Sequence, residues 1–141
     1  MSIWKQPFTL EGLNNTSKNT LVEHLDIEYT DFGPDFLVAT MPVDHRTKQP
    51  AGLLHGGASV VLAESVGSVA SFLCLESMEK MAVGLEINAT HLRAVRSGLV
   101  TAVCRPARVG RSVHVWNIEI SDDQGRLSCV SRLTVSIIDR K

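Results

Sequence analysis

Residues 49–72 read QPAGLLHGGASVVLAESVGSVASF, and this stretch decides the fold. Its Gly-rich entry is followed by an apolar run rich in Gly, Ala and Ser, which predicts one long helix over residues 55–75. The only charge in the quoted stretch is the carboxylate of Glu64. Because an ionised carboxylate is costly to bury without a partner, Glu64 at this position requires a chemical or structural reason.

The segments that precede and follow this helix in the sequence predict one antiparallel sheet. Stretches of alternating apolar and polar residues are separated by turn signals such as Gly33-Pro34 and residues 122–125. A short helix over residues 9–15, capped by Thr9, precedes them. The expected strands are residues 24–29, 35–43, 82–92, 101–105, 113–120 and 126–138. The expected fold class is therefore α+β, with a six-stranded antiparallel sheet wrapped around one long central helix.

The third of these strands has an alternation that indicates which side chains face the helix. Val83, Leu85, Ile87, Ala89 and His91 fall on one face of a regular strand. A histidine on such an apolar face is by default a buried core residue rather than a binding residue.

Length and composition limit the class of protein. The 141 residues predict a single domain over residues 1–141, with a formal net charge of −1 and no cluster of Lys and Arg. We therefore expect no nucleic-acid partner and no membrane partner. The three cysteines have no C-x-x-C spacing, and residues 1–15 lack a secretory signal. These features predict reduced thiols, no metal site and a cytoplasmic location.

Two side chains of the expected helix, His55 and Glu64, are too far apart to act on one atom. Nine residues along a helix give about half a turn of net rotation and a rise of roughly 13 Å. Two chains whose helices run antiparallel about a two-fold axis bring His55 of one chain towards Glu64 of the other. The sequence therefore predicts a homo-oligomer with a shared site. Ser68, four residues after Glu64, lies on the same helical face as the carboxylate.

The start of the expected helix supplies hydrogen-bond donors. Gly56 and Gly57 open it, so backbone N–H groups without intrahelical partners point towards an anion or a developing oxyanion. Opposite a carboxylate, such donors suit attack on a carbonyl. The chain has no Gly-x-Ser-x-Gly elbow, phosphate-binding loop, dinucleotide fingerprint or metal-ligand spacing. Acyl transfer by a carboxylate is the chemistry that remains.

The spacing of Gln49, His55-Gly56-Gly57, Glu64 and Ser68 resembles that of the hotdog-fold thioesterases that use a carboxylate on the central helix. The resemblance covers nearly the whole chain, from IWKQPFTLEGLN at residues 3–14 to SRLTVSII at residues 131–138. Two branches of this family are the most similar. One hydrolyses 1,4-dihydroxy-2-naphthoyl-CoA in menaquinone synthesis, and the other is the proofreading thioesterase of enterobactin synthesis. The resemblance implies hydrolysis of acyl-CoA thioesters, with a preference for aromatic acyl groups, by a homotetramer built as a dimer of dimers.

The resemblance also implies roles for individual residues. Glu64 is the nucleophile or the general base that activates water, and Ser68 orients Glu64 or the water. The Gly56 amide polarises the thioester carbonyl. Gln49 and His55 hold the carbonyl or sulfur side of the thioester from the partner chain.

Coenzyme A is part of the substrate in this family, and no separate cofactor is implied. Val69 is expected to contact the acyl group, and Ala51 stands where the family has a phenylalanine. The residues that match coenzyme A contacts are Gly84, His91, Leu92, Arg93, Arg108, Val109, Gly110 and Arg111. Arginines at such positions suit phosphate groups. An acyl or aryl carrier protein is the alternative partner.

Other interpretations of the same residues stay open from sequence alone. Glu64 can be a structural charge paired across an interface, His55 a helix-entry hydrogen-bond donor and Ser68 a packing residue. Arg108 and Arg111 can belong to a solvated turn. Besides acyl-CoA hydrolysis, the alternatives are a proofreading thioesterase acting on mis-acylated aryl carrier protein, a non-catalytic acyl-thioester binding module and a hotdog dehydratase.

Overall fold

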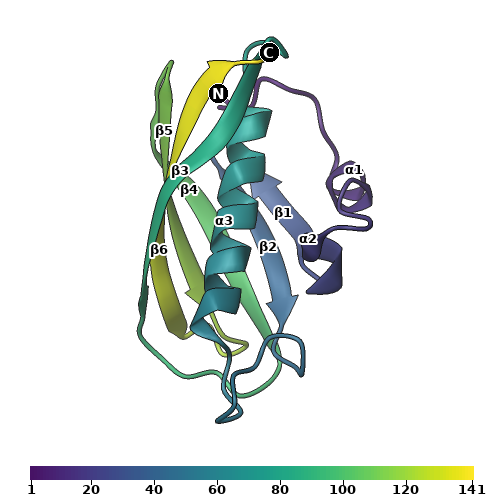
Figure 1. Ribbon diagram of the computed structural model, residues 1–141, viewed down its shortest axis with the longest axis vertical. Helices are drawn as coiled ribbons and strands as arrows, with labels where there is room; N and C mark the ends of the chain where they lie inside the picture. The colour runs from purple at the N-terminus through teal and green to yellow at the C-terminus, as the bar shows by residue number, and fades with distance from the viewer.

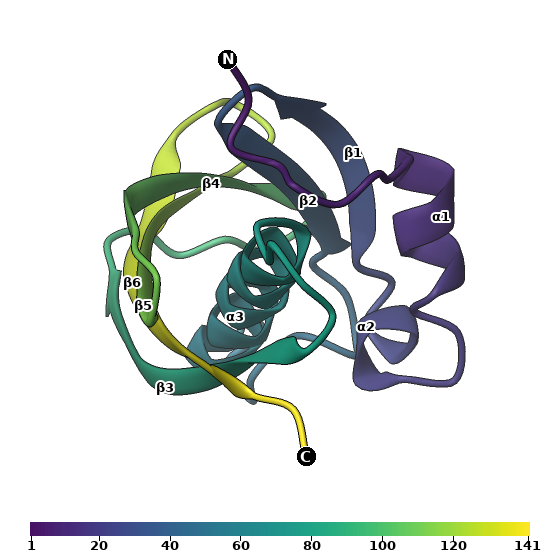
Figure 2. The ribbon, with the colours of Figure 1, turned by 90° about the horizontal axis from the view of Figure 1, so that it is seen from above.

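The computed structural model describes residues 1–141 and contains three helices and one six-stranded antiparallel sheet. The helices are α1 (Leu10–Asn15), α2 (Leu21–His24) and α3 (Gly56–Leu73). The strands are β1 (Glu28–Gly33), β2 (Phe36–Pro42), β3 (Lys80–His91), β4 (Leu99–Val109), β5 (Val113–Ser121) and β6 (Leu127–Asp139). They lie in the order β1-β2-β4-β5-β6-β3. Figures 1 and 2 show the sheet curled around α3, which confirms the expected fold class.

Helix α3 forms the centre of the core because its small and apolar side chains let it approach the sheet closely. Leu62 and Val66 are completely buried. Gly67 is one point of close approach, since a Cβ there would lie 2.6 Å from Cδ2 of Leu133 in β6. The chain's cysteines are also buried and free, as expected for packed thiols: Cys74, Cys104 and Cys129.

The boundaries of α3 lie just inside the expected range of residues 55–75. His55 is the N-cap residue and Cys74 is the C-cap residue. By length and composition α3 is apolar enough to cross a membrane. Figure 2 shows the sheet curved around it, and 44% of the helix is buried inside the protein, so packing against the sheet accounts for part of its apolar composition.

Strand β3 departs from the expected alternation. A β-bulge between Gly84 and Glu86 leaves Leu85 without a partner on β6. The extra residue reverses the phase of the strand, so Val83 and Leu85 are 39% and 66% exposed while Ile87 packs against the core. The prediction that Val83 and Leu85 share the face of Ile87 is therefore wrong.

The first expected strand also begins later than its sequence indicated. Residues 21–24 form α2, and Ile27 N–H bonds to the Val22 carbonyl at 3.0 Å. Asp26 turns the chain with a positive φ of 57°. Strand β1 therefore starts only at Glu28, and the prediction of a strand over residues 24–29 is wrong for its first four residues.

Candidate active site

His55 opens α3 and leaves one backbone donor free. Its Nδ1 accepts a hydrogen bond from the Gly57 N–H at 2.8 Å. Its carbonyl accepts from the N–H groups of Ala58 and Ser59 at 3.0 and 3.3 Å. The Gly56 N–H has no partner within the chain. This amide is therefore available to a carbonyl oxygen or an anion.

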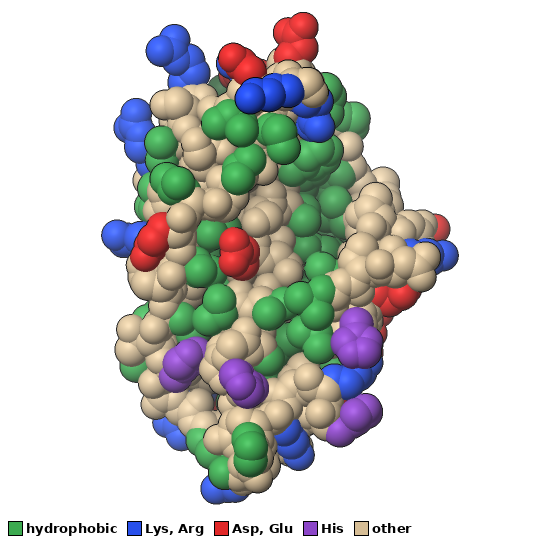
Figure 3. All heavy atoms as spheres, viewed as in Figure 1, with side chains coloured by type: hydrophobic (Ala, Val, Ile, Leu, Met, Phe, Trp, Pro, Cys, Tyr) green, Lys and Arg blue, Asp and Glu red, His purple; other side chains and the backbone are tan.

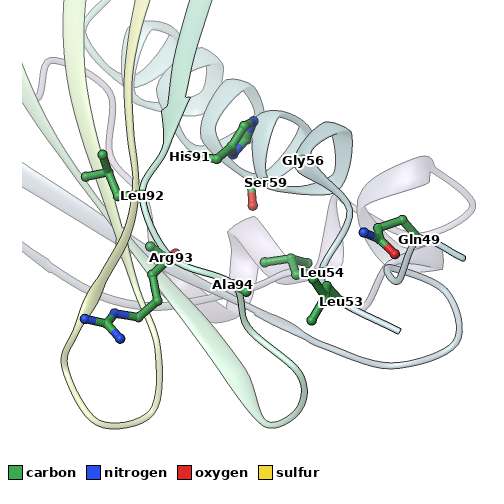
Figure 4. A pocket seen from close by; sticks show the side chains of 10 residues that line it. Gln49, Leu53, Leu54, Gly56, Ser59, His91, Leu92, Arg93 and Ala94 are labelled. Carbon is green, nitrogen blue, oxygen red and sulfur yellow. The ribbon is translucent and has the colours of Figure 1, made fainter. Parts of the chain in front are cut away.

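A cavity of about 380 Å³ lies at this end of α3 (Figure 4). Its walls come from the loop before α3, the first turn of α3, the chain from the end of β3 onwards and the start of β6. The lining residues are Gln49, Leu53, Leu54, Gly56, Ser59, His91, Leu92, Arg93, Ala94 and Ser128. Four of the ten are apolar, and the polar ones converge on the cavity from several segments, as in a site that orients a small molecule.

The loop before α3 holds Gln49 at this cavity. The Gln49 N–H donates to the Leu53 carbonyl at 2.8 Å, and the Gln49 carbonyl accepts from the Gly52 N–H at 2.9 Å. Gly52 adopts a φ of +85°, which favours glycine in this turn. The side-chain Oε1 of Gln49 accepts from the Ala51 N–H. The Nε2 of Gln49 is therefore the free end of the amide and a second donor at the cavity.

His91, at the end of β3, lies against the first residue of α3. A Cβ added to Gly56 would lie 2.8 Å from Nε2 of His91, so only a glycine leaves room for this ring. The side chain is exposed. The default expectation that His91 is a buried core histidine is therefore wrong.

Glu64 lies about two turns further along α3, outside the cavity. Its side chain is half-buried and makes no hydrogen bond or ion pair within the chain. The backbone of Gly84 adjoins it, since a Cβ on Gly84 would be 2.7 Å from Oε2 of Glu64. Ser68, one turn later, is also half-buried. Among the expected coenzyme A contacts, Gly84 thus adjoins Glu64 and does not line the cavity.

The face of α3 that carries Glu64 is not covered by the sheet. In Figure 1 α3 lies in front of the sheet, and Figure 3 shows apolar side chains spread over this side of the molecule. Phe72 of α3 and Leu85 of β3 are 44% and 66% exposed. Strand β3 is in addition an edge of the sheet. An unpaired edge beside an apolar face is typical of a surface that pairs with another chain.

The second group of expected coenzyme A contacts lies at the opposite end of the sheet from the cavity. Residues 108–111 lead through the β4–β5 turn to Val113. Val113 and Val83 both pair with Ser136 of β6, so they lie at the same height along the strands. His91 lies eight residues beyond Val83 along the strand, a distance of about 26 Å. Within one chain, therefore, the remaining expected coenzyme A contacts form two separate groups. The group at the cavity is His91, Leu92 and Arg93. The group at the turn is Arg108, Val109, Gly110 and Arg111.

Half of the residues in the cavity wall are not among those predicted from the sequence. The missed residues are Leu53, Leu54, Ser59, Ala94 and Ser128. Ser59 carried a usable signal, because it follows Gly56 by three residues and so shares its helical face. The other four lie in segments whose path depends on the tertiary structure, and no sequence pattern marks them.

One family and several known proteins are similar to this chain. Residues 51–129 match the thioesterase superfamily. The chain is 58% identical over 136 residues to the 1,4-dihydroxy-2-naphthoyl-CoA hydrolase of Escherichia coli, covering 96% of this chain and 99% of that protein. It is 55% identical over 136 residues to the proofreading thioesterase EntH of Cronobacter turicensis, covering 96% of this chain and 98% of that protein. A mutant thioesterase from Pseudomonas aeruginosa, solved with a glutamine replaced by alanine, has a TM-score of 0.97 at 52% identity and covers 99% of this chain and 100% of that chain.

Proposed function

The chain belongs to the thioesterase superfamily, and we propose that it hydrolyses aromatic acyl-CoA thioesters such as 1,4-dihydroxy-2-naphthoyl-CoA, with Glu64 as the catalytic carboxylate. That it is a thioester hydrolase follows from the family and from relatives named hydrolase and thioesterase. The aromatic acyl group is supported by the name of the E. coli relative. The role of Glu64 is supported by one observation above all: a half-buried carboxylate without a partner on the open face of α3.

The proposed donors and the proposed carboxylate are too far apart within one chain. Gly56 and Glu64 are eight residues apart, which is about 12 Å along α3. A reacting carbonyl needs to lie about 3 Å from both groups. We infer that two subunits pair with their α3 helices antiparallel, through the open face of α3 and the edge strand β3. Gly56 of one subunit then faces Glu64 of the other, and two such dimers form the expected tetramer.

In this shared site each group has a chemical task. The Gly56 N–H and the Gln49 amide donate hydrogen bonds to the thioester carbonyl oxygen and stabilise its charge as the carbon becomes tetrahedral. Glu64 of the partner subunit either attacks that carbon or takes a proton from an attacking water, with Ser68 orienting the carboxylate or the water. The C–S bond then breaks and the thiolate takes up a proton. Either route consumes one water and releases a free acid and a thiol.

His55 supports this arrangement from the start of α3. Because its Nδ1 accepts the hydrogen bond from Gly57, the neutral ring carries its proton on Nε2. The Nε2–H is then free to donate to the sulfur or carbonyl side of the thioester. His55 therefore both caps α3 and supplies a further donor to the proposed site.

Coenzyme A is proposed to span two subunits. Arg93 lies at the cavity, whereas Arg108 and Arg111 lie at the opposite end of the same sheet. Antiparallel pairing through β3 brings opposite ends of the two sheets towards each other. Arginines from both subunits can then hold the phosphates of one coenzyme A.

A thioester on a carrier protein is the second candidate substrate. The 55% identity to a proofreading thioesterase supports it. Steady-state thiol release distinguishes the two when the same aromatic acyl group is offered on coenzyme A and on an aryl carrier protein. A higher kcat/KM for the carrier-protein thioester would replace coenzyme A in the proposal.

Replacing Glu64 by glutamine tests its role. Glu64→Gln is expected to keep the fold and the oligomeric state and to lower turnover by about 10² to 10⁴-fold, because the neutral amide neither attacks nor accepts a proton. Glu76→Gln, an exposed carboxylate elsewhere in the chain, is the matched control and is expected to retain native turnover. A Glu64→Gln enzyme with a near-native rate would contradict the assignment.

The acyl preference is tested at Val69, which is partly buried and packs against the core. Val69→Met is expected to lower kcat/KM for naphthoyl-CoA relative to benzoyl-CoA, because overfilling a packed slot costs about 1 to 3 kcal/mol for the larger ring. The measurement is kcat/KM for naphthoyl-, benzoyl- and hexanoyl-CoA on both enzymes. A native preference for the alkyl chain would remove the aromatic substrate from the proposal.

A further inference from the structure

Ser59 is unlike every other buried polar side chain in the protein. The buried polar residues are Thr47, Ser59, Ser71, His114, Ser128 and Ser131. All except Ser59 make a side-chain hydrogen bond within the chain. Only 3% of Ser59 is exposed, yet its hydroxyl has no partner. Ser59 is therefore the one buried polar residue whose hydroxyl is left free for a partner from outside the chain.

The free hydroxyl of Ser59 opens into the cavity. No fully enclosed side-chain polar atom in the protein lacks a partner, so the Ser59 hydroxyl must reach open space. Ser59 lines the cavity at the start of α3, and Figure 4 shows its oxygen directed away from the helix. The residue is therefore poised to bind a ligand and not to complete the core.

Helix geometry places this hydroxyl beside the free donor of the first turn. Ser59 follows Gly56 by three residues, so the two lie on one helical face. Helical side chains lean towards the N-terminus, which carries the Ser59 hydroxyl over the turn that begins at Gly56. His91 limits the space on the other side of Gly56, with its Nε2 2.8 Å from where a Cβ would lie.

The charges and donors around the cavity define what it can hold. Gly56 offers a free N–H, and Gln49 offers its Nε2 because its Oε1 is already occupied. Arg93 adds a positive charge, and no carboxylate lines the cavity. An atom bound between Gly56 and Ser59 is therefore a hydrogen-bond acceptor, such as a carbonyl oxygen.

We propose that the Ser59 hydroxyl donates a hydrogen bond to the carbonyl oxygen of the bound thioester, alongside the hydrogen bond from Gly56. This rests on the function proposed above and adds a catalytic residue to it. Both hydrogen bonds strengthen as the oxygen gains charge in the tetrahedral state, so Ser59 acts on the rate more than on ground-state binding.

Two substitutions of Ser59 separate the hydrogen bond from the space that the side chain fills. Ser59→Ala removes the hydroxyl, and Ser59→Cys restores the volume with only a weak donor. Both are expected to lower kcat for an aromatic acyl-CoA by about 10²-fold, with KM changed less than about twofold. The Tm of Ser59→Ala is expected to be equal to or above the native value, because no hydrogen bond within the protein is lost.

Ser131 is the matched control. It is a buried serine that does not line the cavity, and its hydroxyl donates to the Asn88 carbonyl at 2.8 Å. Ser131→Ala is expected to lower Tm and to leave kcat unchanged, the reverse of Ser59→Ala. A native kcat in Ser59→Ala would overturn the proposal, and so would recovery of the rate in Ser59→Cys.

The result for Ser59 is compared with that for Glu64→Gln. Native kcat in Ser59→Ala beside an inactive Glu64→Gln overturns the role of Ser59 and leaves the proposed function standing. Native kcat in both variants overturns the proposed function as well. Loss of kcat in both, with Tm kept in Ser59→Ala, supports both proposals.

Discussion

The carboxylate of Glu64 and the backbone of Gly84 occupy adjoining space, because a Cβ on Gly84 would stand only 2.7 Å from Oε2 of Glu64. Gly84 lies at the β-bulge that precedes Glu86. No hydrogen bond within the chain holds the Glu64 carboxylate, so the strand backbone at Gly84 limits where it can lie. The glycine at this position is thus explained by the room that the carboxylate needs.

We predict that Gly84→Ala displaces the Glu64 carboxylate. A misplacement of a catalytic group by about 1 Å can cost about 10²-fold in rate, so kcat is expected to fall about 10- to 100-fold with little change in KM. Steady-state kinetics with an aromatic acyl-CoA measure this. A raised KM with native kcat would instead support the coenzyme A contact that the family resemblance implies for Gly84.

Shortening the carboxylate provides an internal check on the same contact. Glu64→Asp moves the carboxylate back by one methylene, so the added methyl of Gly84→Ala has less to displace. The two substitutions are therefore expected to be non-additive, with the double variant better than the product of the single effects. Val83→Ala, on the opposite face of β3, is the control and is expected to leave kcat unchanged.

A site shared between subunits predicts complementation. Gln49→Ala and Glu64→Gln are each expected to inactivate the enzyme, because each removes one side of every site. In a mixed dimer one site carries both substitutions and the other carries neither. Equal mixing with free subunit exchange should therefore restore about a quarter of the native activity. Absence of recovery, with exchange shown by mass-labelled subunits, would place both residues in one chain's site.

Asp44 organises the loop that carries Gln49. Its carboxylate accepts hydrogen bonds from the Arg46 N–H at 2.9 Å and from Nη2 of Arg46 at 2.6 Å. Its own N–H donates to Oγ1 of Thr47 at 3.1 Å. The side-chain hydrogen bond from Arg46 lowers the pKa of Asp44 from 3.8 to about 2. Folding therefore favours the ionised form of Asp44.

The depressed pKa of Asp44 gives a pH dependence with a definite sign. Stabilisation from the ionised group is complete above its unfolded pKa and disappears as the pH falls through its folded pKa. Asp44→Asn is therefore expected to melt below the native protein at neutral pH, with the difference in Tm closing between about pH 4 and pH 2. A constant difference in Tm over this range would contradict the role of the ion pair.

The sequence predicts the architecture well because the architecture depends on local patterns. The small-residue run before and after Glu64 and the alternating strands are visible residue by residue. The bulge at Leu85 is different, because it arises from how β3 pairs with β6. One extra residue there reverses the side-chain phase, and no propensity of Val83 or Leu85 indicates it.

The candidate site is predicted less completely for a similar reason. Gln49, Gly56 and Glu64 are marked by their spacing around the helix start. The spacing of Ser59 from Gly56 places it on the helical face of that glycine, but only its burial without a partner separates it from the other serines of the same run. The separation of Arg93 from Arg108 is set by the strand order, which the sequence does not specify. Tertiary pairing therefore decides what spacing alone cannot.

A buried polar network joins α3 to β5 at the other end of the core. Oγ of Ser71 accepts a hydrogen bond from Nε1 of Trp116 at 2.6 Å and lies 2.9 Å from Nδ1 of His114. Because Trp116 can only donate, the Ser71 hydroxyl is free to donate its own proton to Nδ1 of His114. This arrangement fits a neutral imidazole, and burial lowers the pKa of His114 below its ordinary value of 6.5.

We predict that this network makes folding stability fall in mild acid. Below about pH 6.5 the unfolded chain binds a proton at His114 that the folded chain resists, so stability is lost as the pH drops from 6.5 towards the lower folded pKa. Ser71→Ala is expected to cost about 1 to 3 kcal/mol at neutral pH, because it leaves two buried partners unsatisfied. His114→Asn is expected to lower Tm at neutral pH but to flatten its change between about pH 7 and pH 5. Calorimetry across this range tests both, and an equally steep decline in His114→Asn would assign the pH dependence to another group.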